Sequence, residues 1–463
     1  MLWLRRLLLL GLFGCLAIGI VGAGVYIWVR TQDVGEIALQ ERAADDPPPL
    51  PAPAPAETDW PWWRGIAANN VAGPGSPPTT WGVSENVLWH VDVPGRGHSS
   101  PTIWGDHIFL TTADDAQQTQ SLLCFDRETG EKKWDKVIRR GGFQSIHEKN
   151  SHASPTAACD GKYVYTVFMS DGKIWATATD FDGNQVWQAE AGPFIGKFGY
   201  GSAPAIYGSL LIVAGDNHGS RFEKIRKTSF LAALDRATGK FAWRIDRPDE
   251  NSCGTPIVAQ VAGKPQLLIA GFRKVCGYNP LNGQELWHCD WSADRTAGTM
   301  AYGDTLVYAS ATTKSKDLIA IAADGSGDVT ADKIAWRSTK GAADVPTPLV
   351  YDGLLYVVDD AGVAACYDAL SGDSVWKKRL GGNFSSSPVI AGGHIYVANE
   401  DGVTYVFKPG KEYEAVAQND LGDGMFATPT FCGDRVYVRT LHHLWCLGSA
   451  APQAAALPSG ATE

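Results

Sequence analysis

The chain has 463 residues, a formal net charge of −10, and hydrophobic residues at 44% of its positions. Its acidic and basic residues are interspersed, and the absence of a basic stripe excludes a nucleic-acid-binding surface. It contains 17 Trp residues, which indicates that one packing contact is used many times over.

The first 30 residues form a candidate membrane segment. Arg5 and Arg6 are followed by a run from Leu7 to Val29 that contains no charged residue. Such a run is long enough to cross a bilayer, and the arginines are expected to stay in the cytoplasm. We therefore predict that residues 1–30 anchor the chain in the inner (cytoplasmic) membrane by a single pass, with the remainder on the periplasmic side.

Two other fates of this segment stay open. The small residues from Val21 to Gly24 could form a signal-peptidase site, although they contain no Ala-x-Ala motif, and the protein would then be secreted. The run Leu12-Phe13-Gly14-Cys15 resembles a bacterial lipobox, which would make Cys15 the lipidated N-terminus of a lipoprotein.

The flanks of the main domain differ from it in composition. Residues 31–58 are acidic and then rich in Pro and Ala, so we expect an extended linker that spaces the domain from the membrane. The run Trp60-Pro61-Trp62-Trp63-Arg64-Gly65 marks the start of the ordered part, and we expect its aromatic rings to cover the outside of the domain. Residues 449–463 are rich in Ala and Pro and are expected to form a disordered tail.

Between the linker and the tail, one sequence motif is repeated. The full motif begins with Ser or Thr before Pro, passes through apolar strands to an Asp and a Gly turn, and reaches a Trp, and several copies depart from it. Eight copies occupy residues 86–448, about 45 residues each, a period typical of four-stranded propeller blades. In one copy Met300 replaces the Pro and the last turn is enlarged, from Asp324 to Lys333. The copies open at Ser100-Pro101, Ser154-Pro155, Pro204, Thr255-Pro256, Met300, Thr347-Pro348, Ser387-Pro388 and Thr428-Pro429.

Each copy contains four short strands separated by turn residues. In the sixth copy we predict strands at residues 348–351, 354–358, 363–367 and 374–378, with Asp- and Gly-containing turns between them. In the Asp-x-x-x-Gly turn the carboxylate can accept backbone N–H groups, while Gly supplies the positive φ that closes the turn. The Trp four residues after the Gly falls on the fourth strand, where we expect it to pack on the neighbouring blade.

The two ends of the array are complementary. The last copy has only three strands, and an extra strand that contains Trp89 precedes the first copy. Pairing of this strand with the last copy would close a ring and remove exposed sheet edges. We therefore predict an all-β fold, an eight-bladed β-propeller of four-stranded antiparallel blades over residues 59–448, closed by the N-terminal strand and preceded by one transmembrane helix.

The nine Cys residues include no Cys-x-x-Cys motif, so neither a zinc site nor a thioredoxin-like site is indicated. Cys124, Cys366 and Cys446 share one third-strand position, as small buried residues would. In an oxidising compartment, a disulfide between Cys124 of the first copy and Cys446 of the last copy is an alternative that the sequence does not decide.

The phrase Ala-x-Asp-x-x-Thr-Gly-Lys-x-x-Trp is intact from Ala233 to Trp243. It resembles the repeat of the PQQ-binding-like β-propeller superfamily, which includes quinoprotein dehydrogenases and the outer-membrane assembly factor BamB. The motifs at residues 60–65, 94–101 and 149–154 further resemble those of BamB-like, membrane-anchored propellers of planctomycetes. The resemblance implies an eight-bladed extracytoplasmic binding protein.

The dehydrogenases of this superfamily resemble one another in a Ca²⁺ bound by Glu and Asn, a catalytic Asp and often adjacent Cys residues over the quinone. This sequence has no Cys-Cys pair, and its carboxylates near the expected channel, Glu148, Asp216 and Glu250, fall in no matching motif. We therefore expect no enzyme activity and no cofactor, and PQQ with Ca²⁺ is the unsupported alternative.

A propeller gathers the loops before its first strands, and those between its second and third strands, around one end of the channel. In this sequence these loops carry aromatic, basic, amide and carboxylate side chains, which suit partner or ligand binding. Two His residues and a Glu in one of them could hold a metal, but five-residue spacing in a loop is weak evidence and we predict no metal site. The candidate binding residues are His98, His147, Glu148, Lys149, Asn150, His152, Tyr200, Asp216, Asn217, Arg221, Arg226, Arg273 and Lys274.

Two functions are consistent with these features. The first is a non-enzymatic scaffold that presents propeller loops to a protein partner in cell-envelope or outer-membrane assembly. The alternative is a quinone- or small-ligand-binding enzyme or sensor that uses the central channel.

Overall fold

The computed structural model describes residues 42–217, 228–248, 252–313 and 316–449. The chain divides into two compact units, Met1–Ala38 and Leu39–Glu463, and all described residues belong to the second. The predicted membrane segment and nearly all of the predicted tail lie outside these ranges. Within them, no helix has the length and apolar character that a membrane span requires.

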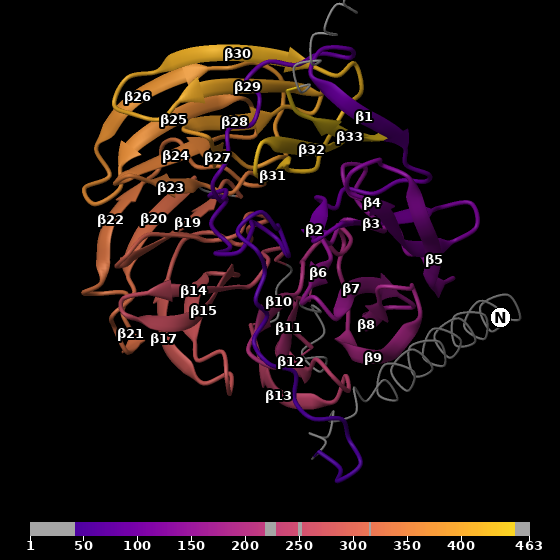
Figure 1. Ribbon diagram of the computed structural model, residues 1–463. Helices are drawn as coiled ribbons and strands as arrows, with labels where there is room; N and C mark the ends of the chain where they lie inside the picture. The colour runs from indigo at the N-terminus through magenta and orange to yellow at the C-terminus, as the bar shows by residue number, and fades with distance from the viewer. Residues whose placement is uncertain (1–41, 218–227, 249–251, 314–315, 450–463) are drawn as a thin grey trace, which may run out of the picture. The chain divides into compact units, whose positions relative to one another are not determined.

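Eight β-sheets are arranged around a central axis (Figure 1). Blades one to four contain β2(Thr102–Trp104), β3(His107–Asp114), β4(Thr119–Asp126) and β5(Lys132–Arg140); β6(Ala158–Cys159), β7(Tyr163–Ser170), β8(Lys173–Asp180) and β9(Gln185–Pro193); β10(Ala205–Tyr207), β11(Leu210–Gly215), β12(Phe230–Asp235) and β13(Phe241–Asp246); β14(Ile257–Val261), β15(Lys264–Gly271), β16(Lys274–Tyr278) and β17(Glu285–Asp290). Blades five to eight contain β18(Ala301–Tyr302), β19(Leu306–Ala311), β20(Asp317–Ala322) and β22(Ile334–Ser338); β23(Leu349–Tyr351), β24(Leu354–Val358), β25(Val363–Asp368) and β26(Ser374–Arg379); β27(Val389–Ala391), β28(His394–Ala398), β29(Val403–Lys408) and β30(Glu414–Asp420); β31(Thr430–Cys432), β32(Arg435–Arg439), β33(His443–Leu447) and β1(Val87–Asp92). The predicted eight-bladed all-β propeller is confirmed.

The ring is closed by a strand from the N-terminal side of the array. β1 pairs antiparallel with β33, so that Trp89 lies opposite Cys446 and Asp92 opposite His443. The strand order β1-β33-β32-β31 makes β1 the outermost strand of blade eight. This is the closure that the incomplete last copy predicted.

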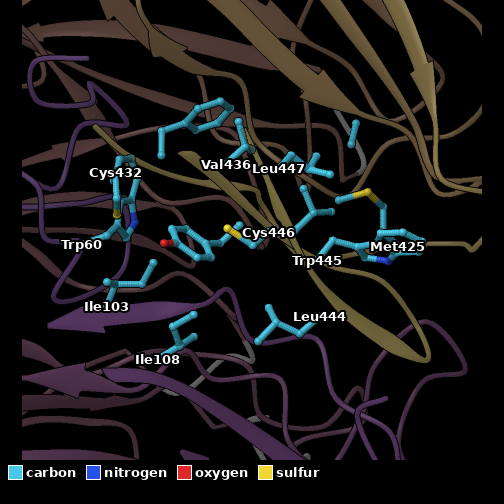
Figure 2. Packing of buried hydrophobic residues seen from close by; sticks show 14 of the residues in the cluster. Trp60, Ile103, Ile108, Met425, Cys432, Val436, Leu444, Trp445, Cys446 and Leu447 are labelled. Carbon is cyan, nitrogen blue, oxygen red and sulfur yellow. The ribbon is translucent and has the colours of Figure 1, made fainter. Parts of the chain in front are cut away.

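A hydrophobic cluster joins blade eight to blade one (Figure 2). Ile103 and Ile108 of blade one belong to it together with Leu447 of blade eight, and all three side chains are fully buried. Cys446 lies in the same cluster, where burial raises the pKa of its thiol to about 11. The described cysteines are free thiols, so the disulfide considered between Cys124 and Cys446 is not formed.

The repeated Asp-x-x-x-Gly turn has the hydrogen bonds that the sequence predicted. In blade one, Asp126 Oδ1 accepts the N–H groups of Glu128 (2.9 Å) and Thr129 (3.0 Å). Gly130 has a φ of 75°, and a Cβ at this position would lie 2.5 Å from the ring of Trp89 on blade eight. Glycine is therefore required both by the turn and by the neighbouring blade.

In blades one, two, three, five and six the fourth-strand Trp binds the turn of the next blade, whereas Trp287 of blade four donates to Gln266 Oε1 of its own blade at 2.7 Å. Trp134 of blade one donates its Nε1–H to the carbonyl of Phe181 in blade two at 2.8 Å. The packing role predicted for these residues is confirmed, with a hydrogen bond in addition. The same bond recurs as Trp187 to Arg236, Trp243 to Pro280, Trp336 to Ala369 and Trp376 to Gly410.

Blade four has a fifth strand that the sequence did not predict. The enlarged turn of blade five supplies β21(Gly327–Asp328), which pairs in parallel with β17. Val329 then donates its N–H to the carbonyl of His288 at 2.9 Å. The insertion thus covers an edge of blade four that would otherwise be open.

The aromatic run at residues 60–65 lies at the axis, so the expectation that it covers the outside is wrong. Trp60 forms a β-bridge with Ile103 of β2 and is 3% exposed. Buried Arg64 donates to the carbonyls of Met300 (2.7 Å) and Pro348 (3.1 Å). The reason is that the innermost strands leave backbone groups unpaired at the axis, and this segment satisfies them.

The described part of the expected linker, residues 42–58, contacts blade three. Arg42 pairs with Asp235, and Asp46 with Lys240, at 2.7 Å in each case. The buried Arg236 guanidinium donates to the carbonyl of Pro51. These residues are therefore part of the folded body, because ion pairs hold a segment that has few apolar side chains of its own.

Candidate functional site

A cavity of about 300 Å³ lies at the axis, at the end where each first strand begins. All eight blades contribute to its lining through the residue four positions before the start of the first strand. These residues are His98, Ser154, Gly201, Cys253, Ala297, Val345, Ser385 and Phe426. The loops before the first strands thus converge on one end of the channel, as the sequence predicted.

The repeated Ser or Thr forms a ring of hydroxyl groups around this cavity. Thr428 Oγ1, for example, accepts the N–H of Ser387 in the preceding blade at 3.0 Å. In blade two the ring position belongs to Thr156, two residues after the Ser154 that the repeat predicted. Equivalent bonds run from Ser100 to Thr156 (3.0 Å), Ala203 to Thr255 (3.1 Å), Thr299 to Thr347 (2.9 Å) and Thr347 to Ser387 (3.0 Å).

Trp63 forms the wall of the cavity toward the N-terminal segment. Its Nε1–H donates to Thr299 Oγ1 at 3.0 Å, and its other face lines a second cavity of about 310 Å³ between blades three, four and residues 62–68. Residues of the segment anchored by Arg64 therefore line both cavities.

A cation stacked on an aromatic ring dominates one side of the cavity. The Arg295 guanidinium lies 4.1 Å from the centroid of the Phe198 ring, and His147 contacts the same ring at 6.0 Å. Within the described ranges, that guanidinium donates no hydrogen bond and forms no ion pair. Such a cation can stack on the ring and still offer its N–H groups to a ligand.

The opposite side carries a histidine in its neutral form. The His98 ring stacks on Phe426 with a centroid distance of 4.5 Å. Burial, with the nearby charges of Arg439 and Arg96, lowers the pKa of His98 to about 3. His98 is therefore uncharged at neutral pH and is a hydrogen-bonding and stacking group.

Asp344 is a carboxyl group held in an unfavourable environment in the same cavity. Burial, and then the negative charge of Asp360, raise the pKa of Asp344 to about 6. Its backbone N–H donates to Asp360 Oδ2 at 2.7 Å, which fixes the two carboxylates close together. Asp344 can thus change its protonation state in mildly acidic conditions.

Replacing Asp344 with Asn is expected to stabilise the protein above pH 6. Between pH 4 and 6 the folded state binds more protons than the unfolded state, whose Asp has a pKa near 3.8, so wild-type stability falls as the pH rises. At pH 7.5 the gain should be about 1–3 kcal/mol, and it should vanish near pH 4. Urea unfolding at both pH values measures it, with exposed Asp290→Asn as the control. A variant less stable than wild type at pH 7.5 would contradict the assignment.

Four of the predicted site residues line the cavity: His98, His147, Lys149 and Asn150. Lys149 Nζ contacts both carboxylate oxygens of Glu400, at 2.9 Å each, and so links the rims of blades two and seven. The Asn150 amide donates to the carbonyl of Phe198 at 2.8 Å and fixes that aromatic residue. The side chain of Glu148 is exposed and lies outside the cavity lining.

Four other predicted residues have structural roles. His152 bonds Asp115 at 2.9 Å and the carbonyl of Gln144 at 3.0 Å. The remaining three are buried: Tyr200 donates to the carbonyl of Ala214 (2.9 Å), Asp216 pairs with Arg247 through two bonds (2.7 and 3.0 Å), and Asn217 Oδ1 accepts the N–H of Ile195 (2.7 Å).

Two further predicted residues, Arg273 and Lys274, are not brought to the cavity either. Arg273 pairs with Asp294 at 3.0 Å and Lys274 with Asp290 at 3.2 Å, both outside the cavity lining. Arg221 and Arg226 lie outside the described residues.

Sequence reasoning missed Arg295, Asp344, Phe426 and Trp63 as cavity residues. One signal was available for Phe426, because it stands two residues before the repeated Thr, as His98 stands before Ser100. Arg295 and Asp344 do not stand two residues before the repeated Ser or Thr, so the repeat alone does not identify them.

The cavity does not fit a Ca²⁺–quinone pair of the dehydrogenase type. Ca²⁺ takes six to eight oxygen ligands, whereas Asp344 is the one carboxylate among the described residues that line the cavity. In the described part of the chain, no group of three or more His, Cys, Asp or Glu side chains is placed to hold a metal. The described part of the cavity lining contains one cysteine, Cys253, and no adjacent pair.

The comparisons with solved structures establish the fold. BamB from Moraxella catarrhalis is 14% identical with a TM-score of 0.55, and the match covers 78% of this chain and 99% of that one. Quinohemoprotein alcohol dehydrogenase from Comamonas testosteroni is 12% identical with a TM-score of 0.60, covering 87% and 83%. The computationally designed Ika8 protein is 11% identical with a TM-score of 0.56, covering 79% and 100%.

A comparison with curated proteins gave no match. The family model described as outer membrane protein assembly factor BamB matches residues 81–193, 118–335 and 326–411, which together span more than half of the 463 residues. The chain therefore belongs to the BamB family of PQQ-like propellers.

Proposed function

We propose that this chain is a non-enzymatic, extracytoplasmic binding protein that presents the loops around its axial cavity to a protein partner in cell-envelope or outer-membrane assembly. The family supports this role, since its description is that of an assembly factor. The dehydrogenase neighbours share the fold at 12% identity, which carries no argument for their chemistry.

The observation that carries the proposal is the composition of the cavity mouth. Arg295 on Phe198 and His98 on Phe426 place cationic, polar and aromatic groups at the point where all eight blades meet. Arg and aromatic side chains are enriched at the centres of protein interfaces.

We further propose that the run from Leu7 to Val29 holds the propeller on the periplasmic side of the inner membrane. Its apolar length supports an uncleaved anchor. The intact mass of the mature protein tests this, because an unmodified N-terminus beginning at Met1 supports the anchor. A chain beginning at a diacylated Cys15, or one cleaved after residues 21–24, would contradict it.

Affinity purification from detergent-extracted membranes tests the partner-binding function. Lys149→Glu reverses a charge at the cavity mouth and should abolish co-purification of the partner. Lys408→Glu is the matched control, because Lys408 is also paired with a Glu (2.6 Å to Glu414) but lies at the end of β29, outside the cavity lining. Equal recovery with both variants, or dye-linked alcohol oxidation after addition of PQQ and Ca²⁺, would contradict the proposal.

A further inference from the structure

We propose that the axial cavity binds a carboxylate of a partner polypeptide, either an acidic side chain or a chain terminus, with Arg295 as its main contact. This inference rests on the proposed function, since it names the group by which the partner enters the cavity. Three observations lead to it: an open guanidinium, a ring of hydroxyl donors, and an internal carboxylate already bound at the rim.

The guanidinium of Arg295 is placed for an anion. Stacking on Phe198 at 4.1 Å fixes its plane but uses none of its five N–H groups, and no hydrogen bond from it to a described residue is present. A planar guanidinium recognises a carboxylate through two parallel bonds, which makes Arg the residue suited to this task.

The hydroxyl ring offers further donors. Each of five ring oxygens accepts a backbone N–H from the preceding blade, while its own O–H donates to no residue in the described ranges. A ligand rich in acceptors satisfies these groups, whereas a ligand rich in donors does not. The five residues are Thr156, Thr255, Thr347, Ser387 and Thr428.

Glu400 shows how a carboxylate is held at this rim. Its two oxygens accept from Lys149 Nζ at 2.9 Å each, and Ser385 Oγ donates to one of them at 2.7 Å. Both donors line the cavity. An incoming carboxylate that reaches Arg295 can also exchange with Glu400 on Lys149, because the Lys149 side chain is 48% exposed.

The size and walls of the cavity restrict the occupant. A volume of about 300 Å³ admits one or two side chains and excludes a folded domain. Phe198, Phe426 and Trp63 provide apolar surface beside the polar groups, which favours a carboxylate next to an apolar residue. Among the described lining residues, Asp344 is the one carboxylate. Its negative charge interacts with the positive charge of Arg295, and Asp344 repels an incoming carboxylate least when it is protonated.

Isothermal titration with peptide probes tests the inference on the propeller with residues 42–449 intact. The probes are N-acetyl-Ala-Ala-Phe as the free acid, its C-terminal amide, and 3-phenylpropionate, which lacks the peptide groups. The free acid should bind at least tenfold more tightly than the amide, since a charge-assisted pair is lost in the latter. It should also bind more tightly than 3-phenylpropionate.

Arg295→Gln should remove at least nine-tenths of the affinity for the acid and leave the amide unchanged, while Arg295→Lys should have an intermediate effect. Arg273→Gln is the matched control, because Arg273 also lies over a Phe ring, 5.0 Å from the centroid of Phe272, but outside the cavity. Melting temperatures confirm that each variant is folded.

Equal binding of acid and amide, or an unaltered affinity in Arg295→Gln, would overturn the inference. Tighter binding of 3-phenylpropionate than of the peptide acid would assign the cavity to a free small carboxylate and also contradict it. If Lys149→Glu still abolishes partner recovery in either case, the proposed function stands and only the carboxylate assignment fails.

Discussion

Placing prolines at both His90 and Val91 is expected to destabilise the propeller by roughly 5 kcal/mol, a large share of the ~5–15 kcal/mol typical of a folded domain. Adjacent residues of a strand point their N–H groups to opposite edges, so one of the two prolines must remove a bond from the β1–β33 ladder. The loss of the ladder also frees Trp89 from Gly130 of blade one.

The closure of the ring is what makes this effect large. Without β1, the edge of β33 and the cluster that contains Ile103, Ile108 and Leu447 become accessible to water. Urea unfolding followed by Trp fluorescence measures the loss. Prolines at Val83 and Ser84, upstream of the strand, should have little effect on stability. Equal stability of the two double variants would contradict the closure of the ring by β1.

Asp216→Ala is expected to cost about 3–5 kcal/mol, because it leaves the buried Arg247 guanidinium without its carboxylate. Asp216 and Arg247 are both buried and joined by two bonds of 2.7 and 3.0 Å. Chemical unfolding measures the change. The removal of an exposed pair, by Asp290→Ala, should cost less than about 1 kcal/mol.

The double variant Asp216→Leu with Arg247→Met distinguishes a structural role of Asp216 from a role in partner binding. If the pair is structural, the apolar replacement should recover most of the stability lost in Asp216→Ala. A stable Asp216→Ala protein that no longer recovers its partner would instead make Asp216 a binding residue, as its place in the sequence suggested.

The repeat predicted the fold because the repeated residues form the contacts between neighbouring blades. Gly130 and its equivalents are required by the Trp of the preceding blade, and the repeated Ser or Thr accepts a bond from the loop before the first strand of the preceding blade. Such residues recur at a fixed period because the same geometry recurs. The predicted third strand of the sixth copy, residues 363–367, accordingly lies within β25(Val363–Asp368).

The candidate site was only partly predictable, because one loop position does not determine the direction of a side chain. His147 and His152 are five residues apart in one loop, yet the first lines the cavity and the second bonds Asp115 away from it. The predicted position of the aromatic run at residues 60–65 was wrong for another reason. Its composition indicates burial, but the unpaired inner edges that bind it exist only in the assembled ring.

Site-specific photo-crosslinking in living cells tests most directly the claim that the cavity mouth is the partner-binding face. A benzophenone side chain is introduced at His147, which lines the cavity, or at Leu370, which is 69% exposed in the turn between β25 and β26 at the opposite end. We predict one discrete protein adduct from position 147 and none from position 370. Adducts confined to position 370, or none from position 147 while the partner still co-purifies, would contradict the account.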